Sequence, residues 1–422
     1  MDNITLTKTV PVRGSYDIIV AGGGVAGVAA AVSARRHGAK RVLLVEKTVN
    51  IGGLATTGLI NFFVPMCNGR GKQIIFGMAE ELLRESIKYG YDTLPEVWKN
   101  GEPKEPTKTR YLTHYSPWIF SMQLTELLRK EGVELLLDTL INDVVVEDNT
   151  VRGLVLESKS GTEFYAADYV VDATGDSDIF ERAGAPTVTG QNYFTYVAHE
   201  VNLNSCKRAI EHSDIRHAID HVHGGNANLY GGEHPAERPL YAGVTKEDVT
   251  EYVVENEMEL LERYKTGERK SRELVRIPFM PQFRTTRHIK ADYSLTMDDT
   301  YRHFDDSVGA INDFDHADRL FEIPYRAMIN SDYPNLIAAG RCVSGEGFAW
   351  DILRVIPPAI ISGQAAGVAC VLAKQKSSAI SEIDIPELQH MLAGDNVMIH
   401  FDDSLIPEDT KNSGESVDIG HI

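Results

Sequence analysis

The chain has 422 residues, of which 43% are hydrophobic and 24% charged, a composition that supports a large core in two or three domains, or in one domain with insertions. Its formal net charge of −19 argues against general binding to nucleic acid or to anionic membrane surfaces. The four cysteines form no C-x-x-C pair, which argues against a disulfide scaffold, a zinc site or a redox dithiol and favours a reducing cytoplasm.

The first elements predict a strand, a turn, a helix and a second strand. The N-terminal segment MDNITLTKTVPVRGS contains no apolar h-region, so no secretory signal is expected. Tyr16–Ala21 predicts a buried strand that ends in glycines, and Val25–His37 predicts an alanine-rich helix. Arg41–Val45 predicts a second strand, which ends at Glu46. This order is a βαβ unit of a parallel sheet.

Further helices and strands complete the first part of this domain, which we place at residues 1–190. Two amphipathic helices are expected at residues 77–88 and 121–130, with a surface loop between them at residues 90–115. Strands are expected at residues 133–146 and 151–156. The apolar run Tyr169–Ala173 predicts another buried strand, directly before Thr174, Gly175 and Asp176.

The composition changes between residues 191 and 330, where histidines, charges and aromatics are frequent and strands and helices do not alternate regularly. We predict that this segment is an inserted α+β substrate or cap domain. Residues 331–376 return to the first domain, with a buried strand at Leu336–Ala339 and an apolar helix after Pro358 that is rich in small residues and is expected in the core, not in a membrane. Residues 377–422 are expected to form a polar tail with one weak helix.

The turn after the first strand carries a phosphate-binding pattern. Residues 21–27 read AGGGVAG and contain G-x-G-x-x-G between a predicted strand and a predicted helix. Gly22 permits a tight turn, Gly24 lets the backbone approach a pyrophosphate, and Gly27 lets the helix pack closely on the strand. The helix N-terminus offers N–H groups to the phosphates, and Glu46 stands where a carboxylate accepts hydrogen bonds from ribose hydroxyls. A glycine-rich turn without a ligand is the structural alternative.

Five segments together resemble the FAD-dependent oxidoreductases of the glutathione-reductase-like fold, in the branch that includes the succinate dehydrogenase and fumarate reductase flavoproteins. They read YDIIVAGGGVAGVAAAVSARRHGAKRVLLVEK, NIGGLATTGL, VVDATGDSDIFERAGAP, EIPYRAMI and NLIAAGRCVSGEGFAWDILRVIPPAIISGQAAGVACVLA. The resemblance is weakest between about residues 190 and 270. It implies an α/β fold, with a Rossmann-like FAD-binding domain and an inserted α+β substrate or cap domain, and it implies FAD as the cofactor.

The resemblance also implies which residues hold FAD. Contacts with its adenosine, pyrophosphate and ribityl parts are expected from Gly22, Gly24, Val25, Ala26, Gly27, Glu46, Lys47, Gly53, Leu54, Ala55 and Thr56. Ile141 is expected beside the adenine, whereas Ala173, Thr174, Gly175 and Asp176 are expected to pack over the cofactor. Gly340 and Arg341 end the strand beneath the flavin, and the helix near Pro358 is expected to point its positive N-terminus at the flavin N1 and C2 oxygen.

Three absences from the sequence narrow the family. No second G-x-G-x-x-G unit is present, and no C-x-x-C lies beside the first helix, which together exclude a disulfide reductase of the dithiol type. No histidine follows Gly52 and Gly53, where members with covalent flavin carry one. The FAD is therefore expected to be bound non-covalently.

Three arginines are the main candidates for contact with a substrate. Arg284 and Arg287 lie in a stretch that resembles an R-E-x-R pattern of the family, with Thr285 in place of the acid, and are expected to hold an anion. The alternative is a set of salt bridges with the acidic runs at residues 298–299 and 305–306. Arg354 is expected in a loop near the flavin ring, where the alternative is an arginine that bonds backbone carbonyls.

Other groups in the same loop are candidates for acid–base chemistry. Glu346 or Asp351 would act as a general base if burial raised its pKa, and Trp350 would stack on the substrate; a plain loop role is the alternative for each. Cys342 is interpreted as a small buried residue and not as a reactive thiol. Further acid or base candidates are His199, His288, His303 and His316. No histidine shows metal-ligand spacing, so no metal is expected.

These observations predict an FAD-dependent oxidoreductase, a dehydrogenase or oxidase, that transfers a hydride between flavin and a small polar or anionic organic molecule. A fumarate-reductase-like reductase of an activated double bond is the alternative within this class. A thiazole-synthase-like protein and a non-redox dinucleotide-binding protein are alternatives from other classes. The expected partners are the substrate and an electron acceptor that the sequence does not identify; nucleic acid and membranes are not expected, and assembly into a homo-oligomer stays open.

Overall fold

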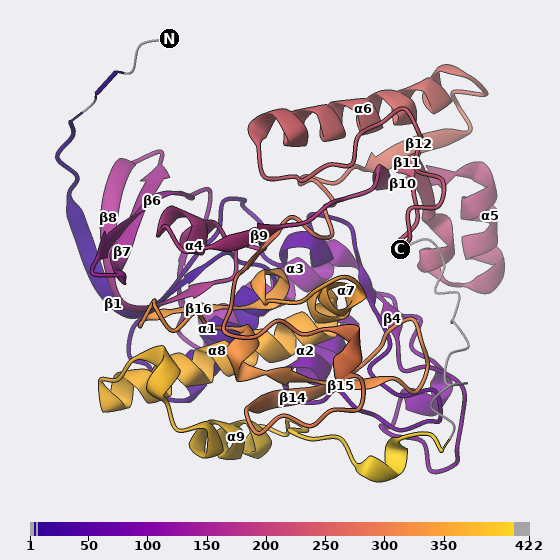
Figure 1. Ribbon diagram of the computed structural model, residues 1–422. Helices are drawn as coiled ribbons and strands as arrows, with labels where there is room; N and C mark the ends of the chain where they lie inside the picture. Colours follow the sequence, from indigo (N-terminus) through magenta and orange to yellow (C-terminus); the bar gives the residue numbers. More distant parts are fainter. Residues whose placement is uncertain (1–3, 6, 409–422) are drawn as a thin grey trace.

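A seven-stranded sheet organises the larger part of the computed structural model, which describes residues 4–5 and 7–408 (Figure 1). Its strands are β1 (Val12–Ala21), β2 (Val42–Val45), β5 (Glu134–Leu136), β6 (Leu140–Glu147), β7 (Thr150–Ser158), β8 (Gly161–Asp172) and β16 (Leu336–Ala338). The order is β5-β2-β1-β8-β7-β6, with β16 paired to the end of β8. The pairs among β1, β2, β5, β8 and β16 are parallel, whereas β6, β7 and β8 form an antiparallel meander. The predicted α/β fold is confirmed.

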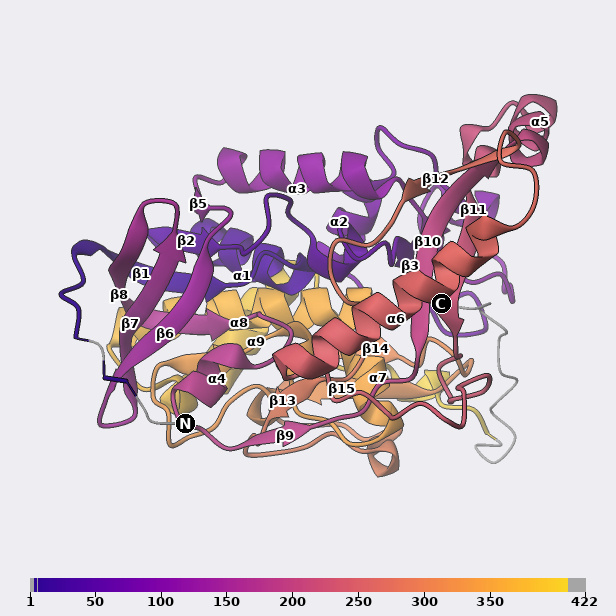
Figure 2. The ribbon, with the colours of Figure 1, turned by 90° about the horizontal axis from the view of Figure 1, so that it is seen from above.

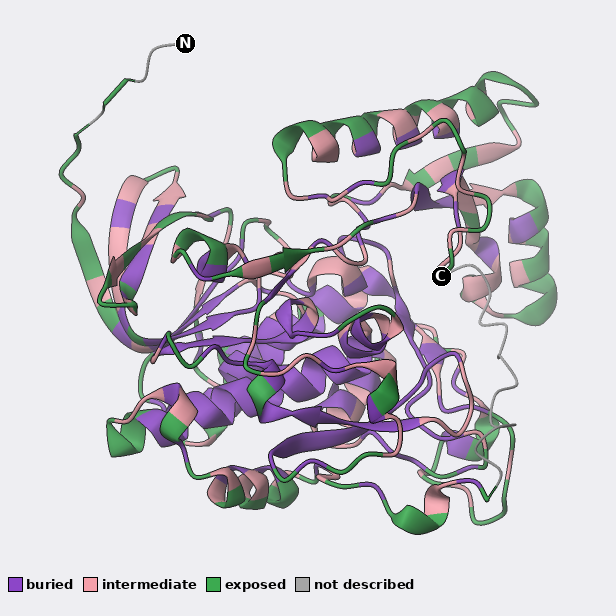
Figure 3. Cartoon of the chain, in the orientation of Figure 1, coloured by how far each residue is buried: buried purple, intermediate pink, exposed green. Residues whose placement is uncertain are grey.

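Two helices pack closely beside this sheet because their contact residues are small. They are α1 (Val25–Arg36) and α8 (Ile356–Lys376), and Figure 3 shows α8 buried along most of its length. A Cβ atom on Gly363 would lie 2.2 Å from the carbonyl oxygen of Ala26, and one on Gly367 would lie 2.2 Å from that of Ala30. Larger side chains would therefore separate the two helices.

The helix α8 is also long and apolar enough to cross a membrane by length and composition alone, with a mean hydropathy of 1.6 over its most apolar window. That window is wholly buried within the fold. The burial is that of a core helix, as the small residues of this segment predict.

The segment between the first two amphipathic helices is anchored more firmly than a surface loop. The helices are α2 (Met78–Ser86) and α3 (Pro117–Lys130), and β4 (Thr113–His114) between them pairs with β3 (Phe62–Phe63). Trp98 lies in the expected loop 90–115 and is fully buried, with its ring stacked on Tyr111 at 4.8 Å between centroids. The proline- and lysine-rich composition of the segment predicts a surface loop and does not indicate this contact, because a single tryptophan makes it.

The strand that enters the inserted part pairs with the strand that leaves it. Strand β9 (Thr187–Thr189) leads into it and pairs with β13 (Arg287–Ile289), which leads out. A separate sheet of β11 (Asp220–Asn226), β10 (Thr195–Asn202) and β12 (Arg272–Arg276) lies between them, with α5 (Leu203–His212) and α6 (Lys246–Lys265) (Figure 2). The rest of the 191–330 segment includes β14 (Ser307–Asn312) and β15 (Leu320–Pro324), which pack near α8 and α9 (Ile385–Gly394).

The C-terminal segment is folded onto this hairpin as far as the structure describes it. The weak helix expected in the tail is α9, and beyond it Val397 and Phe401 are buried. The backbone N–H of Ala310 donates to the carbonyl oxygen of Met398 at 2.6 Å. Leu388 and Leu392 of α9 are also fully buried, so apolar residues scattered through a polar segment anchor it. Residues 409–422, expected to belong to a loose acidic tail, lie outside the described residues.

Candidate flavin and substrate site

The glycine turn after β1 has the geometry of a phosphate cradle. A Cβ on Gly22 would lie 2.4 Å from the carbonyl oxygen of Ala173, and one on Gly27 would lie 1.9 Å from that of Gly22, so the packing of the chain itself demands these glycines. A Cβ on Gly24 would meet no protein atom within 4 Å. Gly24 is therefore explained by a space that the protein leaves open, directly at the N-cap of α1.

The start of α1 is equipped to receive an anion. The first N–H groups of any helix lack partners within the helix. Gly24 provides no side-chain cap, and no acidic residue lies in the first turn of α1. The partial positive charge of this end is therefore not offset locally, which suits a pyrophosphate.

Glu46 and the second glycine loop close this cradle. The buried carboxylate of Glu46 accepts hydrogen bonds from the backbone N–H groups of Gly23 and Thr48, both at 2.8 Å, and keeps lone pairs for further donors such as ribose hydroxyls. The N–H of Gly52 donates to the carbonyl oxygen of Gly23 at 2.8 Å. Gly53 has a φ of 55°, and a Cβ atom on it would lie 3.2 Å from the Cα atom of Gly24. The two glycine loops therefore lie against each other.

The connection between β5 and β6 lies beside Glu46, as an adenine site requires. The N–H of Thr139 donates to the carbonyl oxygen of Glu46 at 3.2 Å. Ile141 follows two residues later and is half-buried, whereas Lys47 is exposed. The role expected for Ile141 beside the adenine stays a prediction. In the second loop, Gly53, Leu54 and Ala55 form a 3-10 turn, and the buried Thr56 follows it.

The A-T-G-D segment is held over the cradle by Arg341. Its Nε donates to the carbonyl oxygen of Gly175 at 2.7 Å, and its Nη2 pairs with Asp176 at 2.7 Å. Gly340 has a φ of 68° and donates its N–H to the hydroxyl of Ser362, on α8, at 2.9 Å. The guanidinium of Arg341 thus joins the ends of β8 and β16, and its expected contact with the cofactor stays a prediction.

The N-terminus of α8 supplies a second positive helix end. Its cap, Val355, provides no side-chain acceptor, its first turn contains prolines and no acid, and the helix extends over 21 residues. A partial positive charge at such an end stabilises an anionic reduced flavin. The open space at Gly24, the buried Glu46 and this helix end together fit FAD.

Arg284 and Arg354 lie close enough for their charges to interact, a pairing that the sequence did not predict. Burial, together with the positive charge of Arg354, lowers the pKa of Arg284 to about 10. Arg354 is not in a loop as expected: it is the last residue of the helix α7 (Phe348–Arg354), because the seven residues after Gly347 complete two helical turns. There its Nε donates to the Asp351 carboxylate, one turn earlier, at 2.7 Å.

Arg287 is engaged elsewhere. Its Nε donates to the carbonyl oxygen of Asp176 at 2.8 Å, and its Nη2 pairs with Asp178 at 2.8 Å. Its Nη1 lies 3.4 Å from the Glu181 carboxylate. These contacts favour the salt-bridge alternative, with carboxylates of α4 (Asp178–Arg182) as partners in place of the acidic runs that the sequence suggested.

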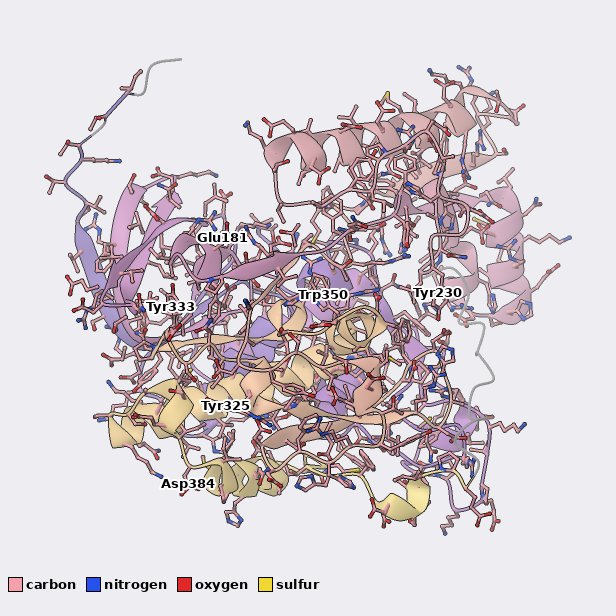
Figure 4. The ribbon with its side chains drawn as sticks, in the orientation of Figure 1. Glu181, Tyr230, Tyr325, Tyr333, Trp350 and Asp384 are labelled. Atoms are coloured by element: carbon pink, nitrogen blue, oxygen red, sulfur yellow. The ribbon has the colours of Figure 1, made fainter. Side chains whose placement is uncertain are left out.

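The remaining candidates near α7 have structural contacts. Glu346 is exposed, so the burial that a general base needs is absent there. Trp350 is buried at the centre of the molecule and donates its indole N–H to the carbonyl oxygen of Arg341 at 2.9 Å (Figure 4). Burial raises the pKa of the Cys342 thiol, which keeps it protonated. His288 is buried, and its Nδ1 lies 2.7 Å from the Ile289 carbonyl oxygen.

His303 belongs to a hydrogen-bonded network that sequence spacing did not reveal. Its Nδ1 lies 2.6 Å from Glu322, and its Nε2 lies 2.7 Å from Asp403. His400 Nδ1 lies 3.0 Å from the same buried Glu322 carboxylate. The hydrogen bonds to Asp403 and Glu322 raise the pKa of His303. These separations are those of hydrogen bonds, and a protonated imidazole between two carboxylates satisfies them. His316, the last candidate, lies 3.2 Å from Asp313.

His199 is brought together with basic residues from three other parts of the chain. We call this set the histidine–arginine face; its members are His114, His199, Arg216, His221 and Arg276. The sequence identified His199 singly as a candidate. His114 and Arg276 are 85 and 77 residues away from it in the chain, and the pairing of β10 with β11 and β12 places His221 and Arg276 opposite it.

Comparisons with known proteins agree with a flavoprotein. The tRNA uridine 5-carboxymethylaminomethyl modification enzyme MnmG of Streptococcus gordonii is 32% identical over 166 residues, 38% of this chain and 24% of that protein. The enzyme of the same name from Listeria welshimeri is 26% identical over 162 residues, 37% of this chain and 24% of that protein. The matches therefore span about a quarter of these relatives.

Solved structures with low sequence identity are similar over most of the chain. A geranylgeranyl bacteriochlorophyll reductase-like protein from Thermoplasma acidophilum matches with a TM-score of 0.42 and 13% identity, over 95% of this chain and 96% of that one. The p-nitrophenol 4-monooxygenase of Pseudomonas putida DLL-E4 matches with a TM-score of 0.42 and 14% identity, over 93% and 91%.

A family model described as FAD dependent oxidoreductase matches residues 17–222 and 240–392. These ranges include the glycine turn and Glu46 of the cradle, the A-T-G-D segment, Arg284, Arg354 and α8. The protein is therefore a flavin-dependent enzyme with FAD as its cofactor, and the chain belongs to the FAD dependent oxidoreductase family.

Proposed function

We propose that this enzyme transfers a hydride between flavin and a small polar or anionic organic molecule, and that the anionic group of this molecule lies against Arg284 and Arg354. The observation that supports the proposal is that two guanidinium groups lie near each other. Because Arg284 is buried, its positive charge is unfavourable there unless a negative group offsets it. Arg354 is paired with Asp351, and Nη1 of Arg284 donates to the neutral carbonyl oxygen of Asn228 at 3.0 Å. A substrate carboxylate would lower the repulsion between the two guanidinium groups.

The residues of the chain divide the work between binding and positioning. Bound FAD supplies the two-electron chemistry. Asp351 holds the guanidinium of Arg354 in one orientation through two contacts with the same oxygen, at 2.7 Å and 2.5 Å. Because Arg354 directly precedes the cap of α8, its orientation is fixed relative to the helix end that stabilises reduced flavin. Arg284, on the segment that leaves the inserted sheet, contributes the second charge.

A small molecule is the partner that the charge of the protein supports. The net charge of −19 opposes the phosphate backbone of a nucleic acid, and the MnmG relatives, whose name refers to tRNA, are matched over only 24% of their length. The four cysteines are free, and three of them are buried, which suits a reducing compartment such as the cytoplasm.

The proposal is tested by anaerobic titration of the FAD-loaded protein with a panel of hydroxy acids, amino acids, amines and their neutral esters. We expect an anionic donor to bleach the flavin band near roughly 450 nm, and its methyl ester to bleach it much more slowly. The reverse direction is tested by adding unsaturated acids to the photoreduced protein; reoxidation by these acids, with no donor active, would identify a double-bond reductase. Equal rates with acids and esters would contradict the role given to the arginines.

A further inference from the structure

Three basic side chains form a row across the inserted sheet. His199 on β10 is directly opposite Arg276 on β12 and directly opposite His221 on β11. Directly opposed residues of antiparallel strands project on the same face of a sheet. The rings of His199 and His221 are stacked, with 5.1 Å between centroids and 13° between planes. Arg276, His199 and His221 therefore present one continuous polar row.

The row faces the antiparallel pair of β3 and β4 in the FAD-binding part. The ring of His114, on β4, lies 6.3 Å from that of His221 and stacks on Phe62, on β3, at 4.4 Å. Tyr91 lies on the same side, and its hydroxyl accepts a hydrogen bond from Asn61 at 3.2 Å. The histidine–arginine face thus lies where two parts of the chain meet, a preferred place for ligands.

The charge of this face comes from its arginines. Burial, together with the nearby basic groups, lowers the pKa of His199 to about 3 and that of His114 to about 4, so these rings are neutral at pH 7. Arg216 and Arg276 stay charged. Within the described residues neither guanidinium has an ion pair with a carboxylate. In a protein with a net charge of −19, two such arginines mark a place for a foreign anion.

A buried donor on the same face lacks an acceptor. Nη1 of Arg276 lies 3.5 Å from Nδ1 of His199, and because a guanidinium only donates, Nδ1 is the accepting nitrogen. The hydrogen of the neutral ring is therefore on Nε2. Among the described atoms, this fully buried Nε2 has no hydrogen-bond partner. Leaving such a donor unpaired is unfavourable, so the site is completed by an acceptor from outside the chain.

The face is joined to the cofactor loop through Gln282. Its Nε2 donates to the carbonyl oxygens of Gly58, at 2.7 Å, and Val197, at 3.0 Å, while its Oε1 accepts from the N–H of Val197 at 2.7 Å. Gly58 ends the second glycine loop, and His199 follows Val197 by two residues on β10. A ligand on the histidine–arginine face is therefore bound beside the flavin-binding loop.

We propose that the histidine–arginine face is a second anion-binding subsite, distinct in its residues from the Arg284–Arg354 pair, that takes the carboxylate or phosphate group of a small organic molecule. Arg216 and Arg276 supply the charge, and His199 Nε2 donates to an oxygen of the anion. Binding here does not require turnover, so it is measured independently of the redox proposal.

The test is isothermal titration of the FAD-loaded protein with inorganic phosphate and, in a separate arm, with succinate; the two arms distinguish the source of the oxygen group. We expect saturable binding that Arg276→Gln weakens at least about tenfold, since a charged hydrogen-bond donor is lost. Arg208→Gln is the matched control, because Arg208 pairs with Asp220 beside the same sheet and not with this face. Arg216→Gln gives a second, half-exposed position if Arg276→Gln folds poorly.

The histidine signals supply a readout that calorimetry does not. In nitrogen-15 spectra, the Nε2–H signal of His199, assigned by its absence from His199→Gln, should shift on titration in the wild type and in Arg284→Gln. Binding that Arg276→Gln and Arg216→Gln leave unchanged would overturn the proposal, as would the absence of saturable binding in both arms. If only an RNA oligonucleotide binds through these residues, the face is a nucleic-acid surface and the small-molecule subsite is wrong. Loss of hydride transfer with anion binding intact would contradict the proposed function alone.

Discussion

Replacing Gly24 by valine separates the binding of FAD from the folding of the chain. A Cβ at this position meets no protein atom within 4 Å, and the backbone, at φ −66° and ψ 174°, is in the extended region that valine accepts. The cost to the apoprotein is therefore that of an unfavourable residue at a helix N-cap, about 1 kcal/mol. The side chain would, however, occupy the space assigned to the pyrophosphate, so FAD binding should be lost.

The loss of FAD has a second, larger effect on stability. At a free FAD concentration of about a hundred times Kd, a bound ligand stabilises the folded state by about 2.7 kcal/mol. The wild type should gain this amount when FAD is added, and Gly24→Val should gain none. FAD stoichiometry after gel filtration and unfolding midpoints with and without FAD measure both effects.

Two matched substitutions make the experiment decisive. Gly27→Val should destabilise the protein even without FAD, because its Cβ would lie 1.9 Å from the carbonyl oxygen of Gly22. Gly394→Val, at the exposed end of α9 where a Cβ also meets nothing within 4 Å, should bind FAD normally. Normal FAD stoichiometry in Gly24→Val would refute the assignment of this space to the pyrophosphate.

Arg354→Ala should keep FAD but slow flavin reduction by about a hundredfold, measured by stopped flow. A wild-type rate would show that Arg354 only stabilises the local structure, and loss of FAD would show that it binds the cofactor. Arg284→Ala should raise the substrate concentration for half-maximal reduction more than it slows reduction. Arg287→Ala should lower the unfolding midpoint without changing that concentration, since its partners are carboxylates of α4. The folded-state pKa of His303 is raised, so its stabilising contribution is present below its unfolded pKa of about 6.5 and is lost as pH rises through the folded value. Because His303 is partly exposed, we expect less than about 1 kcal/mol, measured as the unfolding difference between wild type and His303→Gln at about pH 6 and about pH 8; an equal difference at both would show that the imidazole does not titrate there.

The sequence by itself determined the βαβ unit and the cofactor. The buried strand, the glycine-rich turn and the alanine-rich helix follow one another directly in the chain. Each glycine of the turn is required by close contacts with nearby backbone or with the cofactor. Glu46 and the second glycine loop directly follow the second strand of this βαβ unit, so their meeting with the turn follows from the βαβ topology. The small residues of α8 likewise predicted a buried helix, since only a close neighbour demands glycine at positions 363 and 367.

Only the tertiary structure decided which basic residues share a site. Arg284 and Arg287 are three residues apart, yet one faces Arg354 and the other pairs with Asp178, because β13 begins at Arg287 and turns its side chain toward α4. The partners of His199 are set by the register of β10 against its two neighbours, and a shift of one residue would turn the row to the other face. Such pairing depends on contacts between distant segments, and no local pattern of residue types encodes it.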